Sequence, residues 1–318
     1  MLIQHGADVN AEGYGMYGSA LIGAAAEGHE DIVQMLIQNG ANVNKDLEEG
    51  EEEGYIDLTL SAIEAASRGG YQGIVEILLQ CGADITTDGP TLVAASYHGY
   101  LGIVRLLLQN GADVNTQVGV FENALQAASG AGHQEVVKTL IQNGADVNAR
   151  GGRYGNALQA ASGAGHQEVV KTLIQNGADV NARGGRYGNA LQAASRKGYQ
   201  EVIKTLIQSG ANVNAQGGEY GTALQAASCR GYGTIYAVNE KRASSTDFEK
   251  IVEILIQNGA DVNAQGGKFE NALQAALTAK IQPIADILVK NGAVIDPVSQ
   301  PQDVKCRDDF RVRTVLDF

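Results

Sequence analysis

Cysteine, histidine and carboxylate side chains are the ones that could support catalysis or bind a metal in this chain. Cys81, Cys229 and Cys306 are far apart and odd in number, with neither a CxxC pair nor a Cys/His ligand spacing. This pattern argues against structural zinc and predicts reduced thiols in an intracellular protein. GK[ST], GxSxG and HExxH are all missing from the sequence, and the GGRYG segments lack the spacing of a dinucleotide loop. We predict a non-enzyme with no cofactor and no metal site.

Three of the five histidines stand at one recurring place. His29, His133 and His166 each follow a glycine within a repeated motif, and Tyr71 and Tyr199 replace histidine at the same place elsewhere. A position that accepts tyrosine does not depend on proton transfer by an imidazole. We therefore expect these histidines to pack and to form hydrogen bonds.

Seven carboxylates lie between Asp46 and Asp57, in the segment DLEEGEEEGYID. Blocks of like charge are usually solvated and mobile, which is the interpretation we favour. The alternatives are a docking patch for a basic partner and a weak divalent-cation site. The segment lacks the ligand spacing of an EF-hand, so calcium is not expected.

An internal repeat must position all of these residues. The tetrapeptides GADV, GANV, GADI and GAVI recur nine times, and four of the eight intervals between them are 33 residues long. Residues 123–155 are repeated letter for letter at 156–188. This self-similarity indicates a tandem array rather than two globular domains. The tetrapeptides begin at Gly6, Gly40, Gly82, Gly111, Gly144, Gly177, Gly210, Gly259 and Gly292.

Each repeat predicts two short helices and a loop. Asn123 is a good helix N-cap, and Gln126 can return a hydrogen bond to the cap residue as in a capping box. Val136, Val137 and Leu140 form the apolar face of a second helix. We call the glycine-rich segment that leads from a second helix to the next cap the finger. Such a helix pair buries its apolar face only by stacking on its neighbours. The four most regular fingers are residues 145–155, 178–188, 211–221 and 260–270.

The motifs AAS-x-x-GH-x-x-VV and LIQNGADVNA, in this order and at this period, resemble the ankyrin repeat over residues 1–295. The resemblance implies an all-α repeat, an ankyrin-repeat α-solenoid of stacked helix-turn-helix pairs with projecting hairpin loops. N-A-L-Q replaces the family's T-P-L-H, so Asn takes the capping role and Gln stands in for the hydrogen-bonding His. The style of the repeats is similar to fungal ankyrin arrays.

We expect an array over residues 1–296, with a half-repeat at 1–17, then eight helix pairs, and insertions near 46–57 and 232–248. Residues 297–318 form a C-terminal tail with enough apolar side chains to dock on the last repeat. The chain opens in the middle of a second helix, so either it is a piece of a longer array, which we favour, or an unusual half-repeat serves as its cap. We expect a monomer or a fragment of a longer chain.

Charge is unevenly distributed along the chain. The net charge is −13, with −15 in residues 1–122 and +3 in residues 123–221. The total argues against nucleic acid and anionic membranes as partners, and no apolar run approaches 18 residues. The extra positive charge of the central repeats lies in their fingers, at Arg150, Arg153, Arg183 and Arg186.

Six fingers carry an aromatic residue two positions before the helix cap. The ladder of rings either packs finger against finger or offers ring edges to a partner, and the sequence leaves both alternatives open. These residues are Tyr17, Phe121, Tyr154, Tyr187, Tyr220 and Phe269. Together with the arginines, they are the predicted partner-binding residues.

We predict a protein–protein interaction scaffold that binds an unidentified partner across the fingers and the concave face. The alternative is a regulatory or ligand-sensing array of a larger signalling NTPase or effector enzyme. We expect the cytoplasm, or alternatively the nucleus, as its location.

Overall fold

The computed structural model describes residues 3–11, 17–44, 61–85, 89–118, 123–229 and 244–294. The acidic loop 46–57, Phe121, most of the insertion and the tail 297–318 lie outside these ranges. The chain divides into two compact units, one of residues 1–153 with 175–177 and the other of residues 154–174 with 178–318.

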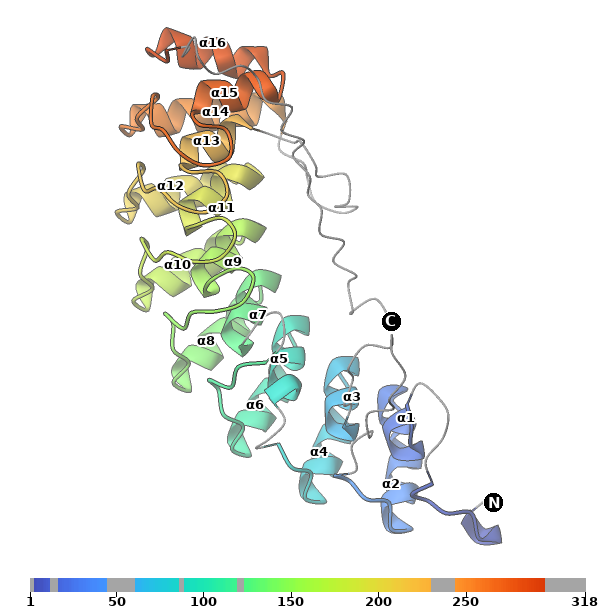
Figure 1. Cartoon of the computed structure of the whole chain (residues 1–318). Coiled ribbons are helices and arrows are strands. Elements are labelled where there is room, and N and C mark those ends of the chain that lie inside the picture. The colour runs from blue at the N-terminus through green and yellow to red at the C-terminus, as the bar shows by residue number, and fades with distance from the viewer. Residues whose placement is uncertain are drawn as a thin grey trace. The chain divides into compact units, whose positions relative to one another are not determined.

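Helices arranged in consecutive pairs make up both units (Figure 1). The described residues contain sixteen α-helices and no strand, as the repeat pattern predicts. The first unit holds a 3-10 turn, η1 (Ile3–His5), and α1 (Ala20–Ala26), α2 (Glu30–Gln38), α3 (Ala62–Gly69), α4 (Gln72–Gln80), α5 (Gly89–His98), α6 (Leu101–Gln109), α7 (Ala124–Ala131) and α8 (Gln134–Gln142). The second holds α9 (Ala157–Ala164), α10 (Gln167–Gln175), α11 (Ala190–Lys197), α12 (Gln200–Gln208), α13 (Ala223–Ser228), α14 (Ser245–Gln257), α15 (Ala272–Thr278) and α16 (Gln282–Lys290).

The odd-numbered helices begin at the predicted caps. The side chain of Asn123 accepts a hydrogen bond from the backbone N–H of Gln126, 2.8 Å away, and the equivalent bond forms at Ser61, Asn156, Asn189, Thr222 and Asn271. The predicted return bond, in which the N–H of the cap residue donates to the Gln side chain, forms from Thr222 to Oε1 of Gln225. The prediction of this bond is wrong at Gln126, Gln159 and Gln192, whose Oε1 atoms have no hydrogen-bond partner.

Glycine ends most odd-numbered helices, and a ring from the next repeat covers it. Gly70 and Gly165 have φ of 76° and 84°, a left-handed conformation that glycine adopts without strain. A Cβ on Gly70 would lie 2.7 Å from the ring of Tyr100, and one on Gly165 would lie 2.6 Å from the ring of Tyr199. The recurring Gly-His and Gly-Tyr pairs therefore join one repeat to the next.

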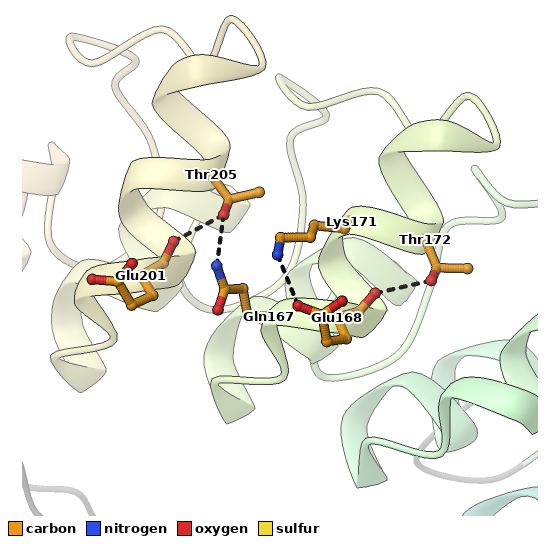
Figure 2. A network of polar contacts seen from close by, with 6 residues as sticks. All are labelled: Gln167, Glu168, Lys171, Thr172, Glu201 and Thr205. Carbon is orange, nitrogen blue, oxygen red and sulfur yellow. Dashed lines mark hydrogen bonds and ion pairs between the residues drawn. The ribbon is translucent and has the colours of Figure 1, made fainter.

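Small and aliphatic side chains build the core of each unit. Within each unit the odd-numbered helices pack on their neighbours, for example α5 on α7 and α11 on α13, and even-numbered helices pack on their partners, for example α8 on α7 and α12 on α11. In α11, Ala193, Ala194 and Ser195 are completely buried, which lets neighbouring helices approach closely. The even-numbered helices also touch. Figure 2 shows Gln167 of α10 donating to the hydroxyl of Thr205 on α12, at 3.4 Å.

The insertion predicted near 232–248 falls between α13 and α14. Residues 230–243 are outside the described part of the chain, whereas Ser244 caps α14 and the residues after it are helical. The backbone N–H of Asp247 donates to the Ser244 hydroxyl, and the Asp247 carboxylate accepts from the Ser244 N–H. The last part of the insertion is thus a capped extension of α14.

Candidate functional site

An asparagine ladder fixes the base of each finger. Asn181 donates from its side-chain amide to the carbonyl of Gly210, 3.1 Å away, and accepts from the N–H of Asn212 at 2.7 Å. Asn10, Asn44, Asn115, Asn214 and Asn263 make the same two bonds to the repeat that follows. Because both bonds come from one side chain, the fingers are held in a fixed register.

Glycine lets successive fingers of the second unit touch through their backbones. Gly218 has φ of 61°, and a Cβ there would lie 2.3 Å from the carbonyl carbon and oxygen of Tyr187. A Cβ on Gly185 would likewise collide with the backbone of Tyr154. Short bridges, Gly184 with Gly188 and Gly217 with Gly221, close two of the fingers as the predicted hairpins. The paired glycines are needed for both conformation and space.

The glutamine of the N-A-L-Q motif joins several first helices to the finger that follows. The amide of Gln192, completely buried, donates to the carbonyls of Ala215 at 3.0 Å and Gly221 at 2.7 Å. Gln159 and Gln225 make equivalent bonds one repeat earlier and later. Buried carbonyls that lose such a partner cost free energy, so these amides stabilise the fingers.

Opposite charges alternate at three finger tips in the second unit. The backbone N–H of Glu219 donates to the carbonyl of Arg186, and the N–H of Lys268 donates to the carbonyl of Glu219, both at 3.0 Å. The Glu219 carboxylate also pairs with Arg186 at 2.7 Å and Lys268 at 3.3 Å. Partial burial raises the pKa of Glu219, but hydrogen bonds and charge from Arg186 and Lys268 outweigh it and hold the pKa below its usual value. Arg186 is therefore already neutralised by its neighbour.

The predicted aromatic residues differ in exposure. Tyr220 and Phe269 are each 3% exposed and lie in one apolar cluster with Cys229, and Tyr187 packs against that cluster. The rings of Tyr187 and Tyr220 stack with centroids 6.3 Å apart. These contacts favour the packing alternative for Tyr220 and Phe269. Tyr154 and Tyr187 keep part of their surface exposed, and so does Tyr17, whose hydroxyl donates to Glu27 at 2.8 Å.

A buried arginine was missed by the sequence reasoning. Arg196 is 5% exposed, and its guanidinium carbon lies 5.2 Å from the centre of the Tyr220 ring. Burial raises the pKa of Tyr220 to about 12, despite the opposing charge and hydrogen bond of Arg196. A signal was present: Gly163 occupies the equivalent place in the preceding repeat. A large cation that replaces glycine in a near-identical repeat marks a local difference in packing.

The remaining finger arginines are exposed. Arg150 and Arg153 belong to the first unit and Arg183 to the second. None of the three forms an ion pair with a residue that the structure describes. Their guanidinium groups are therefore available to bind carboxylates in solution.

His133 acts as a packing residue in the first unit, as predicted, whereas His29 at the equivalent place is exposed. A ring nitrogen of His133 lies 2.8 Å from the carbonyl oxygen of Tyr97, and its ring covers Gly99. Within the described ranges, no group of three or more His, Cys, Asp and Glu residues could hold a metal ion. None of the helices there is both long and apolar enough to cross a membrane.

Comparison with known families decides what kind of array this is. The model of ankyrin repeats in three copies matches residues 47–118, 92–184 and 124–217, and the model of the single ankyrin repeat matches residues 19–46 and 221–267. The chain belongs to the ankyrin repeat family. The crystal structure of the human ASB11 ankyrin repeat domain is 25% identical to this chain, with a TM-score of 0.59. That match covers 76% of this chain and 99% of the ASB11 domain. No curated protein matches the sequence.

Membership explains the architecture and the general role of the fingers. Ankyrin repeats are generally protein–protein interaction modules, and the fold is typically non-enzymatic. In this ankyrin array the glutamine of N-A-L-Q does form hydrogen bonds to the next finger, as expected of a residue that stands in for the family's histidine. A protein partner is thus implied, and the fingers supply the chemistry from which its nature can be inferred.

Proposed function

We propose that this chain is a protein-interaction array whose fingers bind acidic segments of a partner protein. The observation that carries the proposal is the exposure of Arg150, Arg153 and Arg183 without an ion pair to any described residue. Guanidinium groups bind carboxylates through two parallel hydrogen bonds, and arginine is enriched at the energetic centres of interfaces. The partner is therefore expected to present Asp or Glu side chains to the fingers.

Rigid fingers support this function. The asparagine ladder, the backbone contacts at glycine and the buried glutamine amides hold the fingers before any partner arrives. Preorganised groups lose less conformational entropy on binding. Side chains of the central first helices are almost entirely buried, so the fingers contribute more to the contact than the predicted concave face does. The partly exposed rings of Tyr154 and Tyr187 add apolar contact beside the arginines.

Charge reversal tests the proposal against a matched control. The test variant is Arg150→Glu, Arg153→Glu and Arg183→Glu, and the control is Lys138→Glu, Lys171→Glu and Lys204→Glu. The control lysines lie on second helices, each paired with a glutamate three residues earlier. Both variants change the net charge equally, so long-range electrostatics affects them alike.

Affinity capture from the source cell, followed by mass spectrometry, identifies proteins retained by the wild-type chain. We expect the retained partner to be lost from the arginine variant and kept by the lysine control, with at least tenfold weaker binding for the former. Equal retention by wild type and the arginine variant would show that the finger arginines do not bind the partner. We further propose a reducing compartment, the cytoplasm, which the free thiols of Cys81 and Cys229 support.

A further inference from the structure

The last helix pair, α15 and α16, and the residues just after it carry apolar side chains in contact with solvent. Leu277 is 40% exposed, Val289 is 52% exposed and Val294 is 67% exposed. We call these three residues the terminal apolar patch. The terminal repeat of a stacked array ordinarily needs a polar outer surface, so the patch requires an explanation.

Position within the repeat makes the patch unusual. Leu277 stands where six earlier first helices carry a serine that is completely buried: Ser67, Ser96, Ser129, Ser162, Ser195 and Ser228. Those serines lie on helices that pack against the first helix of the following pair, for example α11 against α13. No described helix pair follows α15, yet the residue here is more apolar than serine. Val294 likewise replaces the exposed Asp or Asn of earlier repeats, such as Asp261.

We propose that the C-terminal segment of this chain, residues 303–318, binds to the terminal apolar patch and closes the end of the array. The segment contains five apolar residues within its last nine positions: Phe310, Val312, Val315, Leu316 and Phe318. Alternation places Phe310, Val312, Leu316 and Phe318 on one side of an extended chain. An apolar segment and an exposed apolar surface are complementary in chemistry, and both gain by leaving water.

Chain length allows this contact. The segment is connected to Val294 itself, and the residues from Ile295 to Phe310 span up to about 50 Å when extended. The nine residues of α16 are only about 14 Å long. A tethered segment also competes at an effective concentration in the millimolar range. This favours the chain's own tail over a second copy, which could instead present the exposed Ile32 and Met35 of its α2.

Full-length variants test the proposal. The tail variant is Phe310→Ser, Leu316→Ser and Phe318→Ser, and the control, on the other side of the extended segment, is Arg311→Ser, Arg313→Ser and Asp317→Ser. Leu277→Ser removes the apolar residue from the patch and restores the residue of the earlier repeats. Amide hydrogen exchange in α15 and α16, together with the melting temperature, is measured for each protein and for the tail variant combined with Leu277→Ser.

We expect the tail variant to raise exchange rates in α15 and α16 at least tenfold and to lower Tm by about 2 °C or more. The control should match wild type. In the Leu277→Ser background, the tail variant should have a smaller effect than it has alone, because both changes break one contact. Unchanged exchange in the tail variant would overturn the proposal. The proposal would also be overturned if the wild type formed a dimer, as measured by analytical ultracentrifugation, and if dilution of that dimer exposed α15 and α16.

Discussion

Gly218 offers the sharpest test of finger stacking in the second unit. In Gly218→Ala, the new Cβ would lie 2.3 Å from the carbonyl group of Tyr187 and 2.5 Å from the nitrogen of Gly188. Backbone atoms cannot rotate away as a side chain can, so the two fingers must separate. Gly210 provides a matched control, because its φ of 88° is also left-handed and nothing lies within 4 Å of its Cβ position.

The expected cost follows from these contacts. Alanine in the left-handed region costs about 1–2 kcal/mol, which applies to both variants. Gly218→Ala also breaks the hydrogen bond from the Glu219 N–H to the Arg186 carbonyl, worth about 1 kcal/mol. It further weakens the partly buried Arg186–Glu219 ion pair. We therefore expect a total of about 3 kcal/mol or more for Gly218→Ala, against about 1–2 kcal/mol for Gly210→Ala.

Two measurements read out this difference. Urea unfolding gives the change in free energy, and amide hydrogen exchange at Glu219 reports whether the fingers have separated. We expect that amide to exchange at least tenfold faster in Gly218→Ala than in Gly210→Ala. Equal unfolding free energies and equal exchange at Glu219 in the two variants would refute the close approach of the fingers.

Two further predictions concern buried polar groups. Gln192→Ala leaves the carbonyls of Ala215 and Gly221 without their amide donor, so we expect a loss of about 1–3 kcal/mol in urea unfolding. The exposed Gln208→Ala should cost less than about 0.5 kcal/mol, and equal losses would contradict the role of Gln192. Tyr220 ionises near pH 10 when unfolded but at about 12 when folded. Wild type should therefore lose about 2–3 kcal/mol of stability between pH 10 and 12 relative to Tyr220→Phe. Parallel pH profiles of the two proteins would show that Tyr220 is not buried.

Local rules predicted the helices well. Asn123 and its equivalents accept the N–H three residues on, and Gly144 takes the left-handed conformation that follows a second helix. These features depend on a few neighbouring residues, which the sequence shows directly. The return bond predicted for Gln126 does not form, and the amide of Gln126 donates to the carbonyl of Ala149, 23 residues away. A capping rule considers only nearby partners and could not anticipate that one.

The chemistry of the fingers depends on contacts between repeats. Arg186 and Arg183 are both basic finger residues, but Glu219 of the next finger neutralises only Arg186. The sequence shows that Glu219 replaces arginine at its position, yet only the stacking brings the two side chains within 2.7 Å. The same stacking buries Tyr220 while part of Tyr154 remains exposed. Periodicity predicted the ladder, and packing decided which of its members reach solvent.

We propose that the partner binds at the fingers. Amide hydrogen exchange of the wild-type chain, with and without the partner identified by affinity capture, locates the contact directly. We predict slower exchange in residues 150–154 and 183–187 when the partner is bound, with α8, α10 and α12 unchanged. Protection confined to those second helices, with the fingers exchanging at their free rate, would contradict the claim.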